Sequence, residues 1–401
     1  MDEGYLSSGD NWRGRFWLPG QPGDKRRGML TYDPKRGITL SLVGGFSNQR
    51  RSPQVPTERR TLRDVSGRFP IIRGRLGSKP VSLLDCLITA STSSGIGFEP
   101  DEQEVRVGRM LTGLFLDDPD AEVFSELTIE LENLTRWDRR EDSVSHFERD
   151  PSHPRGEKWN VSVDPVAPLE VTVGDLTIEL GRRYSMPSGD MRREGLEASA
   201  FVASYLTVVS SQPKSVSQWL ETEKQFQDLL TFAMDAPCAV LSEALTPTEA
   251  FRNDEQARAR SEVWLYARHI NVGDPRAPSV EGREALFTLG TVGVDFHTLI
   301  PRWVAVNDRC RTACDLILGL RYVKGGYLQT QLITAVAAAE AIHAAIASSR
   351  QCQIQSSRRL RRPCSKRFPI TGDNGFAKSW DRTSTLWSGS SQISLGYLTK
   401  K

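Results

Sequence analysis

Hydrophobic and polar residues alternate along much of the first half of the chain. In the segment 37–43, Ile38, Leu40 and Leu42 are separated by polar residues. A period of two is typical of a half-buried β-strand, whose successive side chains point to opposite faces of a sheet. Turns that contain Gly or Pro follow such segments and supply the backbone angles of a tight reversal. Further strands are expected at residues 16–18, 28–32, 69–73, 80–89, 104–116, 169–173, 176–180 and 198–210.

One segment of this half has a helical period instead. Phe124, Leu127 and Leu131 recur at intervals of three and four residues, which predicts an amphipathic helix over residues 121–137. Residues 136–158 are rich in Asp, Arg, Ser and Pro, and we expect an exposed loop there.

Beyond Pro213 the period changes from two to about 3.6. We expect a helix that begins near Val216 and ends before Pro237, because proline cannot continue a helix. After Ala347 the periodicity stops. Further elements of this half are expected as strands at residues 238–241 and 263–270 and as long helices at residues 302–321 and 327–347.

These patterns predict an α+β protein with a β-rich antiparallel N-terminal domain, a helix-rich region and an irregular basic tail. We place the β-rich domain at residues 1–212, the mixed, helix-rich region at residues 213–347, and the tail at residues 348–401. Many short strands at modest spacing favour a twisted antiparallel sandwich or a barrel-like sheet in the first domain.

The charge of the chain is divided unevenly between these regions. Residues 348–401 contain eleven Lys and Arg against two Asp, a net charge of +9. The other 347 residues contain 41 Lys and Arg against 48 Asp and Glu, a net charge of −7. A basic tail often binds nucleic acid through phosphate neutralisation, although most charge runs are only solvated. Within the tail, the candidates for nucleic-acid contact are Arg358, Arg359, Arg361 and Arg362.

Composition and motifs exclude several classes of protein. No uninterrupted apolar run reaches the roughly 18 residues needed to span a bilayer, so we expect no membrane association. The N-terminus lacks the basic and apolar stretches of a secretory signal, so the six Cys are expected to be reduced thiols in the cytoplasm. Phosphate-binding glycine loops and the common hydrolase motifs are absent, and we expect no cofactor.

A few residue groups have a chemical and a plain structural interpretation. His343 follows Glu340 by three positions on a predicted helix, as a catalytic base would, but a satisfied helix histidine is the more common case. Cys310 and Cys314 are one turn apart, yet a structural zinc needs about four ligands, so we expect no metal.

The residues of the N-terminal strand also have both a chemical and a structural interpretation. Arg13 and Arg15 are interleaved with Trp12 and Trp17 in a pattern that suits a base-stacking or glycan surface, whereas aromatic residues in a strand more often belong to the core.

Several landmark segments, in this order and spacing, resemble the N-terminal domain of the ApeA-type anti-phage proteins of bacteria. The similarity covers roughly residues 10–347, and its strength is the order of the segments, not any single motif. The landmarks are Gly14-Arg-Phe-Trp-Leu-Pro19, Gly28-Met-Leu-Thr-Tyr-Asp33, Gly37-Ile-Thr-Leu-Ser-Leu-Val-Gly44, Pro80-Val-Ser-Leu-Leu-Asp-Cys86, Phe124 through Trp137, Pro213 through Thr231, Leu299-Ile-Pro-Arg-Trp303 and Arg321 through His343.

The resemblance implies a sensing module joined to a C-terminal HEPN domain, a helical bundle that is usually a dimeric, metal-independent ribonuclease. Its signature is an Arg followed, after about four to six residues, by a His, which act on the ribose 2′-OH and on phosphate. The implied role is abortive infection, in which RNA is cut after phage infection is sensed.

The chain departs from this pattern, because no His occurs after Ala347. Arg140 and His146 have five residues between them, but they lie in the predicted polar loop, where the spacing is as easily a coincidence. A frameshift or truncation near Ser348 would explain the lost periodicity, the basic charge and the missing His together.

We therefore expect the sensing and scaffold region of an ApeA-like protein, without nuclease chemistry in this chain. Two alternatives remain open: an active HEPN-type ribonuclease with an unrecognised or partner-supplied Arg/His site, and a nucleic-acid binder that acts through its basic tail. The expected partners are a phage-derived trigger or RNA, and a second copy of the chain in a homodimer formed by the helical region.

Overall fold

The structure is a computed structural model of the 401-residue chain. The chain divides into two compact units, Met1–Ser348 and Ser349–Lys401. The structure describes residues 9, 11–46, 67–92, 101–140, 143–148, 152, 158–185, 188–192, 195–199, 201–251, 262–269, 271–273, 285–291, 293, 295–323 and 326–360.

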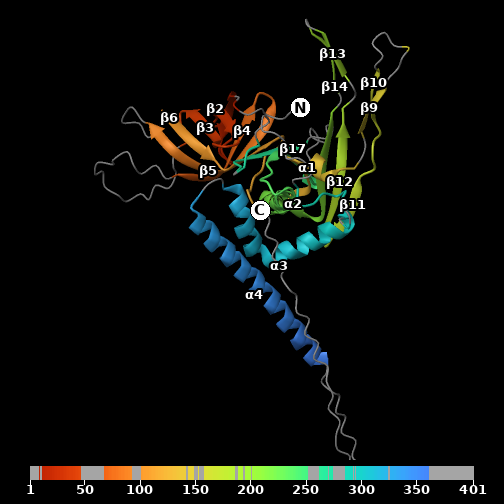
Figure 1. Cartoon of the computed structure of the whole chain (residues 1–401). Coiled ribbons are helices and arrows are strands. Elements are labelled where there is room, and N and C mark those ends of the chain that lie inside the picture. The colour runs from red at the N-terminus through yellow and green to blue at the C-terminus, as the bar shows by residue number, and fades with distance from the viewer. Residues whose placement is uncertain are drawn as a thin grey trace, which may run out of the picture. The chain divides into compact units, whose positions relative to one another are not determined.

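The N-terminal strands form a closed antiparallel barrel, drawn in red and orange in Figure 1. Their order is β5-β4-β1-β2-β3-β6, and pairing between β6 and β5 closes the ring. The strands are β1 (Asn11–Trp17), β2 (Arg26–Asp33), β3 (Gly37–Val43), β4 (Arg68–Leu76), β5 (Lys79–Thr92) and β6 (Glu102–Val107).

The interior of the barrel is filled with side chains. Phe16 is fully buried, and glycines on its own strand and on neighbouring strands leave room for its ring. A Cβ atom on Gly14 or on Gly28 would lie 3.1 Å from that ring, closer than ordinary packing allows. Alternate apolar residues of every barrel strand complete this core, so the barrel is packed and presents its polar residues outside.

A second, open part of the same 13-stranded sheet continues from β5. The sheet passes from the closed barrel to the open part near Asp85 and Gly108. Asp85 adopts a left-handed conformation (φ 56°), and at Gly108 the chain passes from β6 to β7. The order away from the barrel is β7-β17-β16-β8-β15-β12-β11. These strands are β7 (Arg109–Thr112), β8 (Phe124–Leu131), β11 (Leu169–Val173), β12 (Leu176–Tyr184), β15 (Val202–Lys214), β16 (Val240–Pro247) and β17 (Val263–Ala267).

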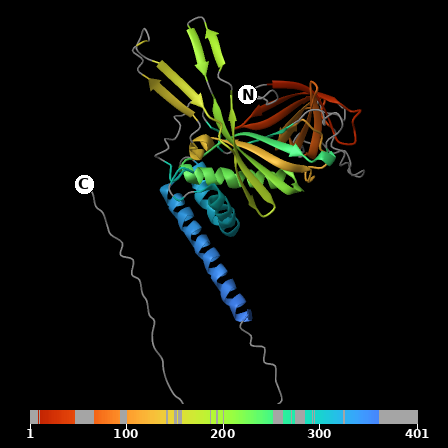
Figure 2. The ribbon, with the colours of Figure 1, turned by 90° about the vertical axis from the view of Figure 1, so that its right-hand side faces the viewer.

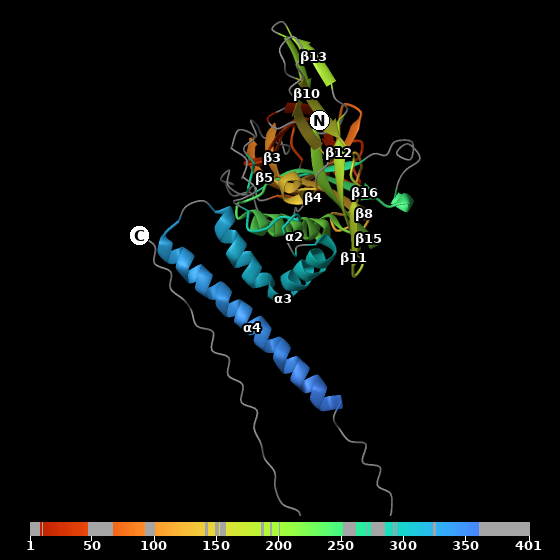
Figure 3. The ribbon, with the colours of Figure 1, turned by 45° about the vertical axis from the view of Figure 1, so that its right-hand side comes forward.

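Helices pack on the open sheet, with α2 next to the strands and α3 beneath α2 (Figure 3). Helix α2 begins with a capping box. The backbone N–H of Gln218 donates to the hydroxyl of Ser215, and the backbone N–H of Ser215 donates to Oε1 of Gln218. Trp219 and Phe226 of α2 are buried in the core that the helices share with the sheet. The helices are α1 (Leu134–Asp138), α2 (Val216–Met234), α3 (Phe296–Tyr322) and α4 (Leu328–Leu360), with a 3₁₀ turn η1 at Glu249–Phe251.

Two short ribbons lie outside the main sheet (Figure 2). One pairs β9 (Ser143–Glu148) with β10 (Lys158–Val163), and the other pairs β13 (Ser188–Arg192) with β14 (Gly195–Ser199). The first ribbon shows that the expectation of a plain loop over residues 136–158 is wrong.

The α+β class and the β-rich N-terminal region are confirmed, and the expected helix over residues 121–137 is wrong. Most of that segment is β8, which lies between β15 and β16, followed by the single turn α1. Leu127, Ile129 and Leu131 are buried at alternate positions, so the period of two applies. Hydrogen bonds to two neighbouring strands stabilise this conformation, and they override the local helical pattern.

Helix α4 differs from expectation in two respects. It continues beyond Ala347 to Leu360. Among the described residues, its segment Leu328–Ala347 is also long and apolar enough, by length and composition, to cross a membrane, and only 6% of the scored window is buried. This segment is not an uninterrupted apolar run, because Gln329, Gln331 and Glu340 interrupt it, and its alanines carry much of its apolar character. A single helix of this kind is weak evidence for a membrane span, since helices of soluble proteins have the same composition.

Candidate anion-binding site

The strand register places three arginines in one line across the outside of the barrel. Arg15 in β1 lies directly opposite Arg27 in β2 on one side and Arg75 in β4 on the other. All three side chains are exposed, because they alternate with buried residues such as Phe16. Directly opposed residues have Cβ atoms roughly 5 Å apart, a distance at which like charges destabilise a sheet.

A groove of about 1020 Å³ runs along this line. Arg13 and Lys25 add two more cations to its lining. Glu102 and Glu104 of β6 line the opposite margin, because Glu102 is opposite Val43 and Glu104 is opposite Ser41. The groove therefore has a cationic end on β4, β1 and β2 and an acidic end on β6.

The arginines of the line have no anionic partner among the described residues, unlike Arg26 and Arg73 of the same barrel. Within the described ranges, no side chain forms an ion pair or hydrogen bond with Arg13, Arg15 or Arg27. By contrast, Arg26 lies 3.0 Å from a carboxylate oxygen of Asp24, and Arg73 pairs with Asp117. Unneutralised cations at directly opposed positions are typical of a surface that binds an anion.

The spacing of the strands makes these cations act together. Adjacent strands lie about 4.8 Å apart, so the three arginines fall within roughly 10 Å, close to one Debye length at physiological salt. Arg15 lies within one Debye length of each neighbouring arginine, so its potential adds to theirs at the surface.

The aromatic residues near the groove hold cations and leave little surface for stacking. Trp17 is only 7% exposed and meets Phe115 edge to face, with ring centroids 5.5 Å apart. Lys25 lies 5.1 Å from the centroid of Trp17, and Arg75 lies 5.4 Å from that of Phe115. Trp12 packs against the barrel core. The arrangement suits the recognition of phosphate or another anion more than the stacking of bases.

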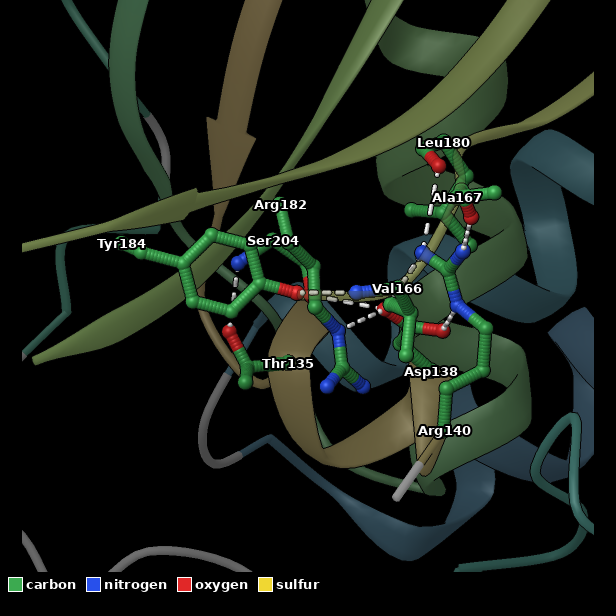
Figure 4. Close-up of polar contacts among 9 residues, drawn as sticks. All are labelled: Thr135, Asp138, Arg140, Val166, Ala167, Leu180, Arg182, Tyr184 and Ser204. Atoms are coloured by element: carbon green, nitrogen blue, oxygen red, sulfur yellow. Dashed lines mark hydrogen bonds and ion pairs between the residues drawn. The ribbon is translucent and has the colours of Figure 1, made fainter. Parts of the chain in front are cut away.

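Arg140, a candidate for catalysis together with His146 on the sequence alone, is engaged in a buried network (Figure 4). Its Nε donates to Asp138 Oδ1 at 2.6 Å, and the carboxylate also accepts from Arg182 Nε at 2.6 Å and from Ser204 Oγ at 2.9 Å. The terminal nitrogens of Arg140 donate to the carbonyls of Ala167 and Leu180. Asp138 is fully buried, so the guanidinium of Arg140 balances a buried charge. His146 lies on β9 opposite Asn160, and its side chain falls outside the described part of the chain.

The other predicted residues are spread over the helices. Glu340 and His343 are exposed on α4, three positions apart, and neither lines the groove. Cys310 and Cys314 are one turn apart in α3, with Cys314 partly buried against the core. Arg358 and Arg359 belong to the last turn of α4, whereas Arg361 and Arg362 lie outside the described residues.

One group of side chains among the described residues could hold a metal ion. Glu223 of α2, Glu243 of β16 and His269, two positions after β17, bring one ligand atom each to within 4.8 Å of the others. Burial raises the pKa of Glu223 to about 7, and burial and the neighbouring Glu223 raise the pKa of Glu243 well above its ordinary value. Burial lowers the pKa of His269. Sequence reasoning did not find this group, because its members are far apart in the chain.

Comparison with known proteins finds a family that matches more than half of the chain. The family model for ApeA N-terminal domain 1 matches residues 11–303. That range includes the whole barrel, the open sheet and the beginning of α3. No curated protein and no solved structure matches the chain.

Proposed function

Because the chain belongs to the ApeA N-terminal domain 1 family, a family of anti-phage proteins, we propose that it is the sensing region of such a protein and that the outer face of its barrel binds nucleic acid. The trigger would be phage-derived nucleic acid or RNA that appears during infection. Both the family match and the groove fall in the same part of the chain, since every groove residue lies within residues 11–303.

The observation that supports this proposal best is the line formed by Arg75, Arg15 and Arg27. Like charges placed directly opposite one another weaken a sheet, and no carboxylate among the described residues neutralises Arg15 or Arg27. A polyanion would supply the missing counter-charge, and release of its condensed counterions would drive binding.

The chemistry of the groove favours backbone contacts over base recognition. Arginine binds phosphate through a planar fork of donors, and the groove exposes arginines together with Lys25. Trp17 is too buried to stack on a base. We therefore expect binding that depends strongly on salt and weakly on sequence.

Cutting of RNA is not expected from this chain. The family resemblance assigns cleavage to a C-terminal HEPN motif, and residues 348–401 contain no His. Glu340 and His343 are exposed neighbours on one helix.

Direct binding tests the proposal. The full chain is titrated into fluorescently labelled single-stranded RNA and into duplex DNA, each of roughly 20 units, and anisotropy is recorded over a range of salt concentrations. We expect binding whose logarithmic affinity falls linearly with the logarithm of salt concentration, and intact RNA at the end of the titration. Equal affinity at low and high salt would contradict the proposal.

A further inference from the structure

The group formed by Glu223, Glu243 and His269 lies where three elements of the core meet. Glu223 is 5% exposed on α2, and Glu243 is 2% exposed on β16. Nε2 of His269 lies 3.3 Å from Oε1 of Glu243. The three ligand atoms therefore face one another inside the first unit of the chain, away from the arginine groove.

The hydrogen bonding of this group is incomplete. Neither carboxylate oxygen of Glu243 receives a hydrogen bond from a donor that the structure describes. Buried polar atoms are nearly always paired, so the two oxygens of Glu243 are an exception. Glu243 is thus a fully enclosed carboxyl group beside a second carboxyl group, that of Glu223, and an imidazole.

A divalent cation would satisfy all three side chains together. Zinc binds His nitrogen and carboxylate oxygen at about 2.0 to 2.2 Å, which places neighbouring ligand atoms of a tetrahedron about 3.4 Å apart. The contact of 3.3 Å between His269 and Glu243 agrees with that separation. Oxygen ligands alone would favour magnesium or calcium, whereas an imidazole favours zinc or another transition metal.

We propose that Glu223, Glu243 and His269 bind one divalent transition-metal ion, with zinc as the best fit. A water molecule or the second oxygen of one carboxylate completes four-coordination.

The position of the site gives the ion a structural role. Glu223 comes from the helix that covers the open sheet, and Glu243 comes from the sheet itself. The backbone N–H of His269 donates to the carbonyl of Pro34 at 3.0 Å, in the turn between β2 and β3 of the barrel. A bound ion would therefore link α2, the open sheet and the barrel at one point.

The test uses the full chain, stripped of metal with a chelator and dialysed. Isothermal titration with zinc should give one ion per chain and should raise the midpoint of thermal unfolding. Glu243→Gln keeps the volume of a side chain whose raised pKa keeps it protonated near neutral pH, so the variant is expected to fold. Its zinc affinity should fall by more than about 100-fold, because even outer residues of metal sites contribute 10- to 100-fold.

A matched control separates this site from the thiols of α3. The double variant Cys310→Ser/Cys314→Ser should bind zinc as the parent chain does. Cobalt in place of zinc should give visible ligand-field bands without the near-ultraviolet absorption of a thiolate ligand. Absence of stoichiometric binding would mean that the two carboxylates share only a proton, and it would overturn the proposal. Binding that persists in Glu243→Gln but disappears in the cysteine variant would overturn it as well.

Discussion

Replacing Arg15 and Arg27 together by Ala tests the nucleic-acid face most directly. The two residues are opposed on β1 and β2, are exposed, and form no ion pair with a described residue. Their removal therefore breaks no described side-chain contact and takes two cations out of the groove. Binding should weaken while the fold is kept.

The size of the effect follows from counterion release. Each phosphate contact on a single strand contributes about 0.7 to the slope of log affinity against log salt, so two contacts contribute about 1.4. At roughly 0.15 M salt this amounts to about 1.6 kcal/mol, or roughly a 14-fold weaker Kd. The free energy of unfolding should rise, because removal of opposed like charges relieves about 0.5 kcal/mol of repulsion.

The assay is fluorescence anisotropy with the labelled single strand over several salt concentrations, accompanied by urea unfolding. A matched control is Arg302→Ala/Arg309→Ala, which removes two exposed cations from α3 and should leave the slope unchanged. The reasoning is refuted if the barrel variant keeps the parent salt slope, or if the control loses as much affinity as the barrel variant.

The other predictions concern the acidic margin, the buried network and α4. Glu102→Gln/Glu104→Gln should tighten nucleic-acid binding about four-fold at low salt, since each charge at roughly 10 Å in water costs about 0.4 kcal/mol; unchanged anisotropy titrations would count against a backbone in the groove. Asp138→Asn should lower the free energy of unfolding in urea by about 3 kcal/mol, because two arginines lose a buried partner, whereas Arg311→Ala, at an exposed ion pair, should change it by less than about 1 kcal/mol. Leu332 is 64% exposed on α4, and we propose that two copies of the chain form a homodimer through the face of α4 that carries it. Leu332→Ser should lower the mean mass measured by sedimentation equilibrium. A parent chain that is monomeric would contradict the proposal.

Elements defined by local signals were predicted correctly. Strand β3 has the bounds expected from its alternation, residues 37–43, and β11 has those expected at residues 169–173. Helix α2 begins after the capping residue Ser215 and ends at Met234, before Pro237. In each case the period lies within the element and the terminating residues lie within a few positions of it, so no knowledge of distant segments is needed.

Elements that depend on distant neighbours were predicted less well. The spacing of Phe124, Leu127 and Leu131 suits a helix, but Ile129 is also fully buried, and hydrogen bonds to β15 and β16 hold the segment as a strand. Closure of the barrel likewise depends on pairing between β5 and β6, which no local pattern reveals.

The candidate site depends on the register of the strands, which the sequence does not reveal. Arg13 and Arg15 alternate with aromatic residues in one strand, and this pattern marks them as candidates. Arg27 and Arg75 have no such pattern around them in the sequence. A shift of one residue in either pairing would turn those side chains into the barrel core, where Phe16 leaves no space for them. The same packed interior that excludes a small ligand therefore fixes the register, and the register in turn sets the arginines in line on the outer surface. An anion that binds to this domain is accordingly expected on the outside of the barrel, and substitutions that loosen the interior should weaken its binding even when every arginine is retained.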